Sequence, residues 1–340
     1  GEDAGSSRFF ETNHEAPYTR HAKQVSKKPI INVGRFTDPD VMVKAITSGQ
    51  CDIIGMARPS IADPFLPNTI KEGRYEDIRE CIGCNVCYSG DSLSVPIRCT
   101  QNPTMGEDWR QGWHPERAAP KGSDGQVLIV GAGPAGLEAA LSLGRRGREV
   151  SVAFAERQAG GRINRESTLP GLATWSRVRD WRLTMLAKLP NLTLYPESVM
   201  TADDVAGFGA DHVVLATGSV WRRDGVGVLG MTPRAFAGAL TPDDIFAGAK
   251  VSGPVVIYDD EHYFMAGALA ERLAGQGHDV TYVTPQNMAS AWTVYTDEQG
   301  FVQARLIEAG VKLQVARYVT GWADGVVRHA GGAAQLLLPG

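Results

Sequence analysis

The chain has 340 residues, of which 43% are hydrophobic and 21% are charged. This composition is typical of a folded protein, and the length exceeds one ordinary core, so we expect two or three domains. The formal net charge of −4 excludes a general electrostatic attraction to nucleic acid or to an anionic membrane. No apolar run could span a bilayer and the acidic N-terminus lacks the apolar region of a signal peptide, so we expect a cytoplasmic protein.

Strand and helix patterns alternate along the chain and predict an α/β fold. Near the N-terminus, apolar strands at residues 29–33 and 52–57 flank a helix between Thr37 and Gly49, with Thr37 as its N-cap. This is a parallel βαβ unit. A polar stretch rich in proline and glycine, residues 112–126, follows and indicates a linker.

Two further blocks repeat the strand–helix–strand pattern after this linker. The second block is predicted to hold strands at residues 127–130, 150–155, 192–195 and 212–216, with a helix at 134–147. The third is predicted to hold strands at 255–258 and 280–284, separated by a helix that ends near Gly275. Both blocks are typical of nucleotide-binding units.

Four of the five cysteines form the pattern Cys81-x2-Cys84-x2-Cys87-x11-Cys99. Five cysteines are too few for a disulfide scaffold in a chain of this length. Three thiolates on one short loop with a distant fourth are how a cubane is held, so the pattern predicts a [4Fe-4S] cluster. A four-cysteine zinc site and incidental cysteines are the alternatives. Cys51 begins an apolar strand, and we expect it to be a packed core thiol.

Each of the first two predicted strands ends in a small residue followed by arginine. These pairs are Gly34-Arg35 and Ala57-Arg58. In a (β/α)8 barrel, the loops after the seventh and eighth strands commonly form a phosphate site at the C-terminal face. A small residue lets backbone N–H groups approach the phosphate, and a guanidinium binds it in a bidentate manner. An exposed ion pair is the alternative interpretation of both arginines.

Residues 126–136 place a G-x-G-x-x-G turn, Gly131, Gly133 and Gly136, between a predicted strand and a predicted helix. The glycines permit the tight turn, the approach of a pyrophosphate and close helix–strand packing. Glu156 follows the second strand and suits a ribose hydroxyl. The turn therefore predicts an ADP or adenine-dinucleotide site, with further close approaches expected at Gly161, Arg162, Thr217 and Gly218.

The third block fails at the corresponding turn. Asp259, Glu261 and Phe264 occupy the places of the three glycines, and Asp260 adds another carboxylate. Like charges about 4 Å apart cost on the order of 1 to 4 kcal/mol, depending on the dielectric constant. We expect this block to keep the fold without a nucleotide site.

With these motifs in this order, the chain resembles the trimethylamine dehydrogenase and histamine dehydrogenase group of old-yellow-enzyme-like iron–sulfur flavoproteins. The most specific matches are residues 57–66, 81–87, 99–102, 112–116 and 201–204. The resemblance implies four regions: the last part of an FMN-binding (β/α)8 barrel at 1–78, a cluster segment and linker at 79–125, an ADP- or FAD-type domain at 126–225, and an incomplete, degenerate NAD(P)-type domain at 226–340.

Carried over by position, the resemblance assigns three groups of residues. Gly34, Arg35, Ala57 and Arg58 would hold the FMN phosphate, and Cys81, Cys84, Cys87 and Cys99 would ligate the [4Fe-4S] cluster. ADP, or FAD in its place, would be held by Gly131, Gly133, Gly136, Glu156 and Arg162, with the close approaches at Gly161, Thr217 and Gly218 beside it.

The resemblance also implies an activity. A small amine would be dehydrogenated or N-demethylated, and electrons would pass from FMN through the cluster to an electron-transferring flavoprotein, in a homodimer when the protein is full length. The 2,4-dienoyl-CoA reductases are the alternative; they usually space their second and third cysteines by three residues and keep a working NADPH site. A third possibility is an electron-relay fragment without catalysis.

The resemblance enters the barrel only near its seventh strand. Two strands cannot close a barrel. We therefore expect an interior piece of a protein about twice as long, whose substrate pocket and catalytic base lie upstream of Gly1.

Overall fold

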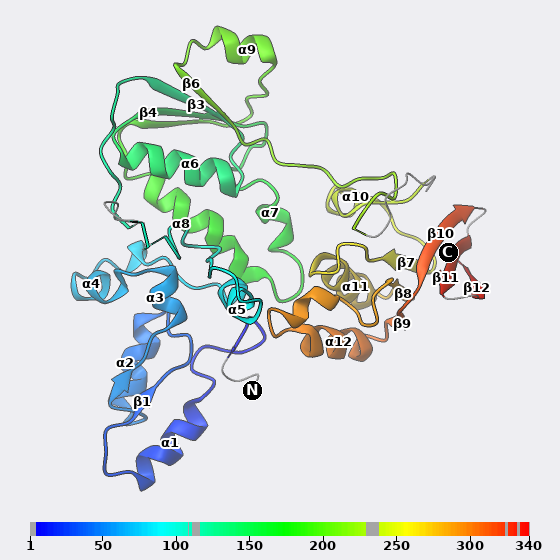
Figure 1. The fold of residues 1–340 in the computed structure, drawn as a ribbon, viewed down its shortest axis with the longest axis horizontal. Helices are drawn as coiled ribbons and strands as arrows, with labels where there is room; N and C mark the ends of the chain where they lie inside the picture. Colours follow the sequence, from blue (N-terminus) through cyan, green and yellow to red (C-terminus); the bar gives the residue numbers. More distant parts are fainter. Residues whose placement is uncertain are drawn as a thin grey trace. The chain divides into compact units, whose positions relative to one another are not determined.

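The structure is a computed structural model that describes residues 5–107, 109–110, 116–228, 238–323, 326–331 and 334–339. The chain divides into two compact units, Gly1–Thr168 with Leu172–Gly218, and Leu169–Gly171 with Ser219–Gly340 (Figure 1). The first unit contains the cysteine pattern, both Gly/Ala-Arg pairs and the glycine turn. Part of the predicted linker, residues 112–115, lies outside the described residues.

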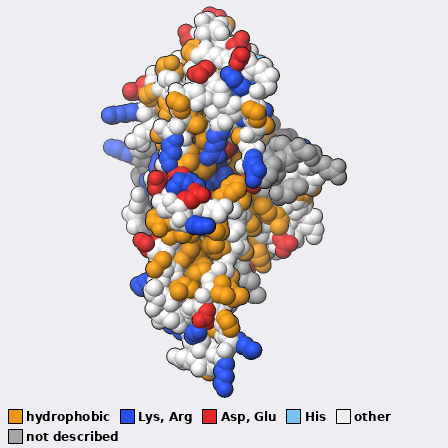
Figure 2. Space-filling model, turned by 90° about the vertical axis from the view of Figure 1, so that its left-hand side faces the viewer, with side chains coloured by type: hydrophobic (Ala, Val, Ile, Leu, Met, Phe, Trp, Pro, Cys, Tyr) orange, Lys and Arg blue, Asp and Glu red, His pale blue; other side chains and the backbone are white. Residues whose placement is uncertain are grey.

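The N-terminal part of the first unit forms the predicted βαβ unit. Strands β1 (Ile31–Asn32) and β2 (Ile53–Ile54) pair in parallel, with Ile31 opposite Ile53, and helix α2 (Pro39–Thr47) connects them. Helix α1 (Ala16–Val25) precedes β1. Apolar side chains remain exposed in this part, among them Ile31 at 60% and Ile53 at 48%. Figure 2 shows hydrophobic side chains gathered on the lower part of the face that it displays.

The predicted N-cap of this helix is wrong by one residue. Asp38 caps α2, and its side chain accepts a hydrogen bond from the N–H of Asp40 at 2.8 Å. Pro39 restricts the residue before it to extended backbone, which is the conformation an N-cap requires. That restriction falls on Asp38 and not on Thr37.

Short helices carry the chain from β2 through the cysteine pattern. These are α3 (Arg58–Ala62), α4 (Leu66–Lys71), the 3-10 helix η1 (Tyr75–Asp77) and α5 (Val86–Ser92). Leu66 and Ile70 of α4 pack with α2 in a small core that includes Phe36 and Cys51. Cys51 is 2% exposed, which confirms the expectation of a core thiol.

The rest of the first unit is a four-stranded parallel sheet with the order β5-β4-β3-β6. Helices α6 and α8 pack over one face through residues such as Leu137, Leu141 and Trp181. Val205 and Phe208 pack on the other face, where α9 lies (Figure 1). The elements are β3 (Gln126–Val130), α6 (Pro134–Arg145), β4 (Glu149–Ala153), α7 (Ile163–Glu166), η2 (Ala173–Ser176), α8 (Arg177–Leu186), β5 (Leu192–Tyr195), α9 (Ala202–Gly207) and β6 (His212–Leu215).

The second unit contains a parallel sheet of order β7-β8-β9 and an antiparallel sheet of order β10-β11-β12. The strands and helix predicted for the third block are present. The elements are α10 (Pro242–Phe246), β7 (Val255–Tyr258), α11 (Met265–Gly275), β8 (Val280–Val283), η3 (Ala291–Val294), α12 (Gln299–Glu308), β9 (Lys312–Gln314), β10 (Tyr318–Ala323), β11 (Val326–Gly331) and β12 (Ala334–Pro339).

The structure therefore confirms an α/β fold with parallel sheets. In the part of the chain that the structure describes, no helix is both long enough and apolar enough to cross a membrane.

Candidate functional site

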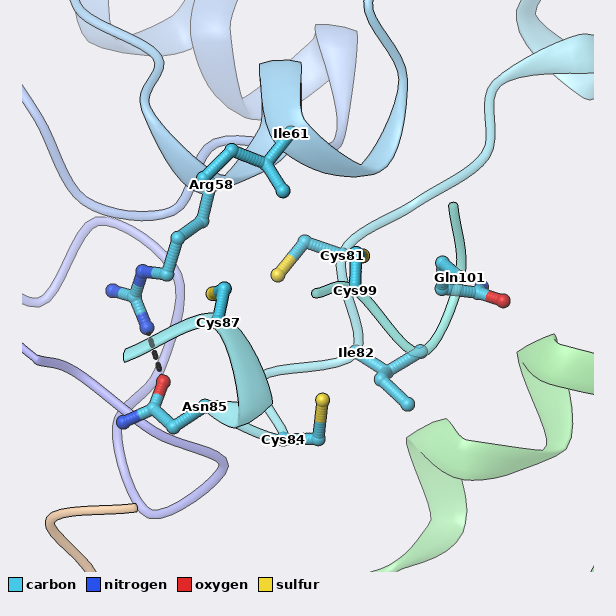
Figure 3. A pocket seen from close by; sticks show the side chains of 9 residues that line it. All are labelled: Arg58, Ile61, Cys81, Ile82, Cys84, Asn85, Cys87, Cys99 and Gln101. Atoms are coloured by element: carbon cyan, nitrogen blue, oxygen red, sulfur yellow. Dashed lines mark hydrogen bonds between the residues drawn. The ribbon is translucent and has the colours of Figure 1, made fainter. Parts of the chain in front are cut away.

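The four patterned cysteines line one pocket of the first unit, with an empty volume of about 300 Å³ that is partly open to solvent. Figure 3 shows their side chains arranged around this space. Among the described residues, no three side chains of His, Cys, Asp or Glu are placed to bind a single metal ion. Four thiols around one volume fit the donor set of a four-iron cubane. The other lining residues are Arg58, Ile61, Ile82, Asn85 and Gln101.

Two left-handed residues shape the loop around Cys84. Gly83 has φ of +68°, which favours glycine, and a Cβ there would also stand 3.1 Å from the main-chain nitrogen of Arg8. Asn85 has φ of +55°, a conformation that asparagine tolerates better than most residues. Its side-chain N–H group donates to the Gly5 carbonyl oxygen. The chain therefore reverses on either side of Cys84.

Burial raises the pKa of three of the cysteine thiols, Cys81, Cys84 and Cys87, in the metal-free protein. It raises the pKa of Cys84 to about 12 and that of Cys87 to about 11. Burial also raises the pKa of Cys81, while the positive charges of Arg58 and Arg35 act in the opposite direction. Because the thiolate is the metal ligand, cluster assembly must displace these protons.

Polar residues next to the cysteines hold the segment together, and the sequence analysis assigned no role to them. The Thr100 hydroxyl lies 3.2 Å from Sγ of Cys84, in hydrogen-bonding geometry. Asn102 donates to the Ile61 carbonyl oxygen at 3.0 Å. The available signal was a run of three polar residues directly after Cys99.

The two predicted phosphate arginines come from neighbouring strand ends. Gly55 donates its N–H to the Asn32 carbonyl oxygen at 2.7 Å, so β1 and β2 end at one edge. Arg35 follows Gly34, has φ of +52° and donates from Nη2 to the Phe10 carbonyl oxygen. Its Nε is buried without a hydrogen-bond partner among the described residues, and burial lowers its pKa. An orphaned buried N–H of a guanidinium fits a phosphate ligand.

Arg58 already has protein partners. It follows Ala57, the N-cap of α3, and its guanidinium donates to the Ser6 hydroxyl and to Oδ1 of Asn85, each at 2.6 Å. The side chain thus lies between Ser6 and the cysteine loop, as Figure 3 shows for its bond to Asn85.

In the full-length protein, Arg58→Ala is expected to weaken FMN binding. A charge-assisted hydrogen bond contributes about 1.5 to 3 kcal/mol, which corresponds to a loss of roughly 10- to 150-fold in affinity. Flavin retained after dialysis measures the effect, and Arg20→Ala, which removes an exposed arginine on α1, is the matched control. If both variants retain flavin as the parent does, Arg58 serves only the contacts with Ser6 and Asn85.

The glycine turn between β3 and α6 is closely packed at two of its three glycines. Gly131 has φ of +105°, and a Cβ there would stand 2.2 Å from the Ala216 carbonyl oxygen. A Cβ at Gly136 would stand 1.9 Å from the Gly131 carbonyl oxygen. Gly133 is the N-cap of α6, and a Cβ there meets nothing within 4 Å. A pyrophosphate-binding turn requires one glycine for the tight turn and one for close packing of the helix. Between them it requires a glycine that leaves space for the pyrophosphate.

The structure also places the other predicted nucleotide residues. A Cβ at Gly161 would lie 3.1 Å from Cα of Gly133, so this loop passes close to the turn. Thr217 and Gly218 are exposed and directly follow Ala216, which contacts Gly131. Glu156 is exposed just after β4. Nε of Arg162 lies 3.7 Å from a carboxylate oxygen of Glu166.

At the acidic turn of the second unit, carboxylates accept the hydrogen bonds that a bound phosphate would accept. Asp259 is 1% exposed and accepts from the N–H of His262 at 2.8 Å and from the Tyr282 hydroxyl. Glu261 accepts from the N–H of Met265, the first residue of α11, at 3.3 Å. Of the expected carboxylates, Asp259 is therefore buried, and its hydrogen-bond donors come from the protein itself.

Tyr282→Phe is expected to destabilise the second unit by about 1.5 to 3 kcal/mol at neutral pH, because the buried Asp259 carboxylate loses a donor. Burial and the Asp259 charge hold the Tyr282 pKa well above its ordinary value. Since an unfolded tyrosine ionises near pH 10, this stabilisation is present below about pH 10 and falls as pH rises further. The difference between parent and variant should therefore shrink above pH 10.

Urea unfolding at neutral pH and above pH 10 measures both effects. Tyr295→Phe, at an exposed tyrosine of the same unit, is the control and should change stability little. A constant difference across this pH range would contradict the assigned hydrogen bond.

Two family profiles match the chain. The NADH:flavin oxidoreductase / NADH oxidase family matches residues 2–77, and the OYE-like second alpha/beta domain matches residues 240–328. Dimethylamine dehydrogenase from Hyphomicrobium sp. is 45% identical, covering 99% of this chain and 49% of that protein.

Two solved structures are similar over nearly the whole chain. Histamine dehydrogenase from Rhizobium sp. 4-9 has a TM-score of 0.96 and 46% identity, covering 99% of this chain and 50% of that one. The 6-hydroxypseudooxynicotine amine oxidase from Pseudomonas geniculata N1 has a TM-score of 0.94 and 46% identity, with 99% and 51% covered. The chain thus spans about half the length of these relatives. The predicted resemblance is confirmed: the chain belongs to the trimethylamine dehydrogenase and histamine dehydrogenase group of old-yellow-enzyme-like flavoproteins.

Proposed function

We propose that the full-length protein is an iron–sulfur flavoprotein that oxidatively dehydrogenates or N-demethylates a small amine. Electrons would pass from FMN through a [4Fe-4S] cluster to an electron-transferring flavoprotein. The observation that carries the proposal is the proximity of both arginines to the cysteine loop: Arg58 lines the same pocket as the four cysteines, and Nη1 of Arg35 lies 2.5 Å from where a Cβ on Gly83 would stand. The residues proposed for the flavin phosphate and the first proposed cluster ligand are therefore neighbours in one compact unit.

Each cofactor has proposed residues in this chain. FMN supplies the oxidation chemistry when bound. Arg35 and Arg58, with the backbone at Gly34 and Ala57, would hold its phosphate, and the four pocket cysteines would hold the cluster. ADP would occupy the glycine turn, with Glu156, Gly161, Arg162, Thr217 and Gly218 around it. We assign the substrate pocket and the catalytic base to no residue of this chain, so we propose that the 340 residues alone lack amine oxidation.

Stopped-flow mixing of the full-length oxidised enzyme with reductants tests this function. Excess methylated or primary amine should bleach the flavin absorbance rapidly, whereas NADH and NADPH should not. The expectation for the nicotinamides rests on the acidic turn, where Asp259 and Glu261 accept the N–H groups that a phosphate would need. Rapid bleaching by NADPH would instead support an enoyl-reductase activity, and bleaching by NADH would also contradict the proposal.

A further inference from the structure

Helix α8 carries a buried arginine that connects two parts of the first unit. Arg182 is 3% exposed, and its Nε donates to Oε2 of Glu138 on α6 at 2.8 Å. Its Nη1 donates to the side-chain oxygen of Gln101, and its Nη2 donates to the main-chain oxygen of the same residue, each at 3.1 Å. One cation thus joins the helix after the glycine turn to the segment after Cys99.

Gln101 in turn closes the cysteine segment. Its side-chain N–H group donates to the Glu80 carbonyl oxygen at 3.1 Å, directly before Cys81. Gln101 is 1% exposed and lines the cysteine pocket. A single side chain therefore fastens both ends of the segment that runs from Cys81 to Cys99, and Arg182 orients that side chain.

Glu138 connects the contacts between Arg182 and Gln101 to the proposed nucleotide site. It lies in the first turns of α6, whose N-cap is Gly133. Gly136 packs so closely on the turn that a Cβ there would stand 1.9 Å from the Gly131 carbonyl oxygen, so the start of α6 is in tight contact with the turn. Removing one partner from a buried ion pair is costly because it leaves an uncompensated charge. We therefore expect a displacement of α6 to act on Arg182 through Glu138, and on Gln101 through Arg182.

We propose that Arg182 is a positioning residue through which a nucleotide bound at the glycine turn stabilises the cysteine pocket. The nucleotide is then an effector of cluster retention, separate from turnover. This inference rests on the proposed function, because it requires both the cluster and an ADP site. Coupling between two sites is reciprocal, so the cluster must also strengthen ADP binding by the same factor.

Iron release to a chelator, measured with and without saturating ADP, tests the coupling. In the parent protein ADP should slow the release by at least about 5-fold, the lower end of typical coupling between sites. In Arg182→Gln the ratio of the two rates should fall to one. Arg146→Gln, which removes an exposed charge just after α6, is the matched control and should keep the parent ratio.

The ratio of the iron-release rates with and without ADP distinguishes coupling between the two sites from a general destabilisation of the cysteine segment. A merely structural role for Arg182 would speed release equally with and without ADP and leave the ratio unchanged, which would overturn the proposal. Glu138→Gln keeps the side-chain shape and gives a second test if Arg182→Gln does not fold; its ratio should also fall. If calorimetry shows saturable ADP binding but the parent releases iron at the same rate with and without ADP, only the coupling is rejected. Absence of iron or of ADP binding would reject the proposed cofactors as well.

Discussion

Cys84→Ala is expected to abolish cluster binding. A four-thiolate cubane requires about four irons per chain, so anaerobically purified parent protein should be brown and the variant should lack both the iron and the brown colour. The physical reason is that Cys84 is one of four thiols around the pocket and the fifth cysteine, Cys51, is buried in a separate core, so no other thiol can replace it. Iron analysis and visible absorbance measure the result. The segment from Glu80 to Asn102 should also become more susceptible to proteolysis, because it loses the metal that orders it.

Cys51→Ala is the matched control for this variant. Cys51 is buried in the core with Phe36 and Leu66 and does not line the cysteine pocket, so its loss should leave the iron content unchanged. Stoichiometric zinc without iron in the parent protein would contradict the cluster and support the zinc alternative.

Gly136→Ala is expected to disrupt the glycine turn and to abolish ADP binding. The added Cβ would stand 1.9 Å from the Gly131 carbonyl oxygen, so α6 must move away from the turn. Overpacking of this kind typically costs about 1 to 3 kcal/mol and sometimes more. Thermal unfolding and calorimetric titration with ADP measure the two effects.

Alanine substitutions at two other glycines distinguish an effect on stability from an effect on ADP binding. Gly133→Ala places its Cβ in open space, so stability should be kept while ADP binding weakens, since the Cβ occupies the approach of the pyrophosphate. Gly207→Ala, at the end of α9 with nothing within 4 Å, should change neither. Unchanged ADP affinity in Gly133→Ala would reject the pyrophosphate assignment.

Features that depend on short spacing and local backbone conformation can be predicted from the amino-acid sequence alone. The cysteine pattern, the glycine turn after β3 and the strands at Leu192–Tyr195 and Val255–Tyr258 were all predictable, because each is encoded within a few residues. The N-cap of α2 marks the limit of this reasoning, since Thr37 and Asp38 both suit the position and only the restriction imposed by Pro39 separates them.

How segments far apart in the sequence come into contact depends on the tertiary packing. No periodicity relates Arg182 to Gln101, 81 residues earlier, yet burial of a guanidinium requires that its N–H groups find acceptors. In the same way, Asp259 could be interpreted from sequence only as a charge that repels phosphate. The fold brings the Tyr282 hydroxyl to it and makes it an internal anion. The hydrogen-bond partners of buried polar groups depend on how helices and strands pack against one another, and local sequence patterns do not predict that packing.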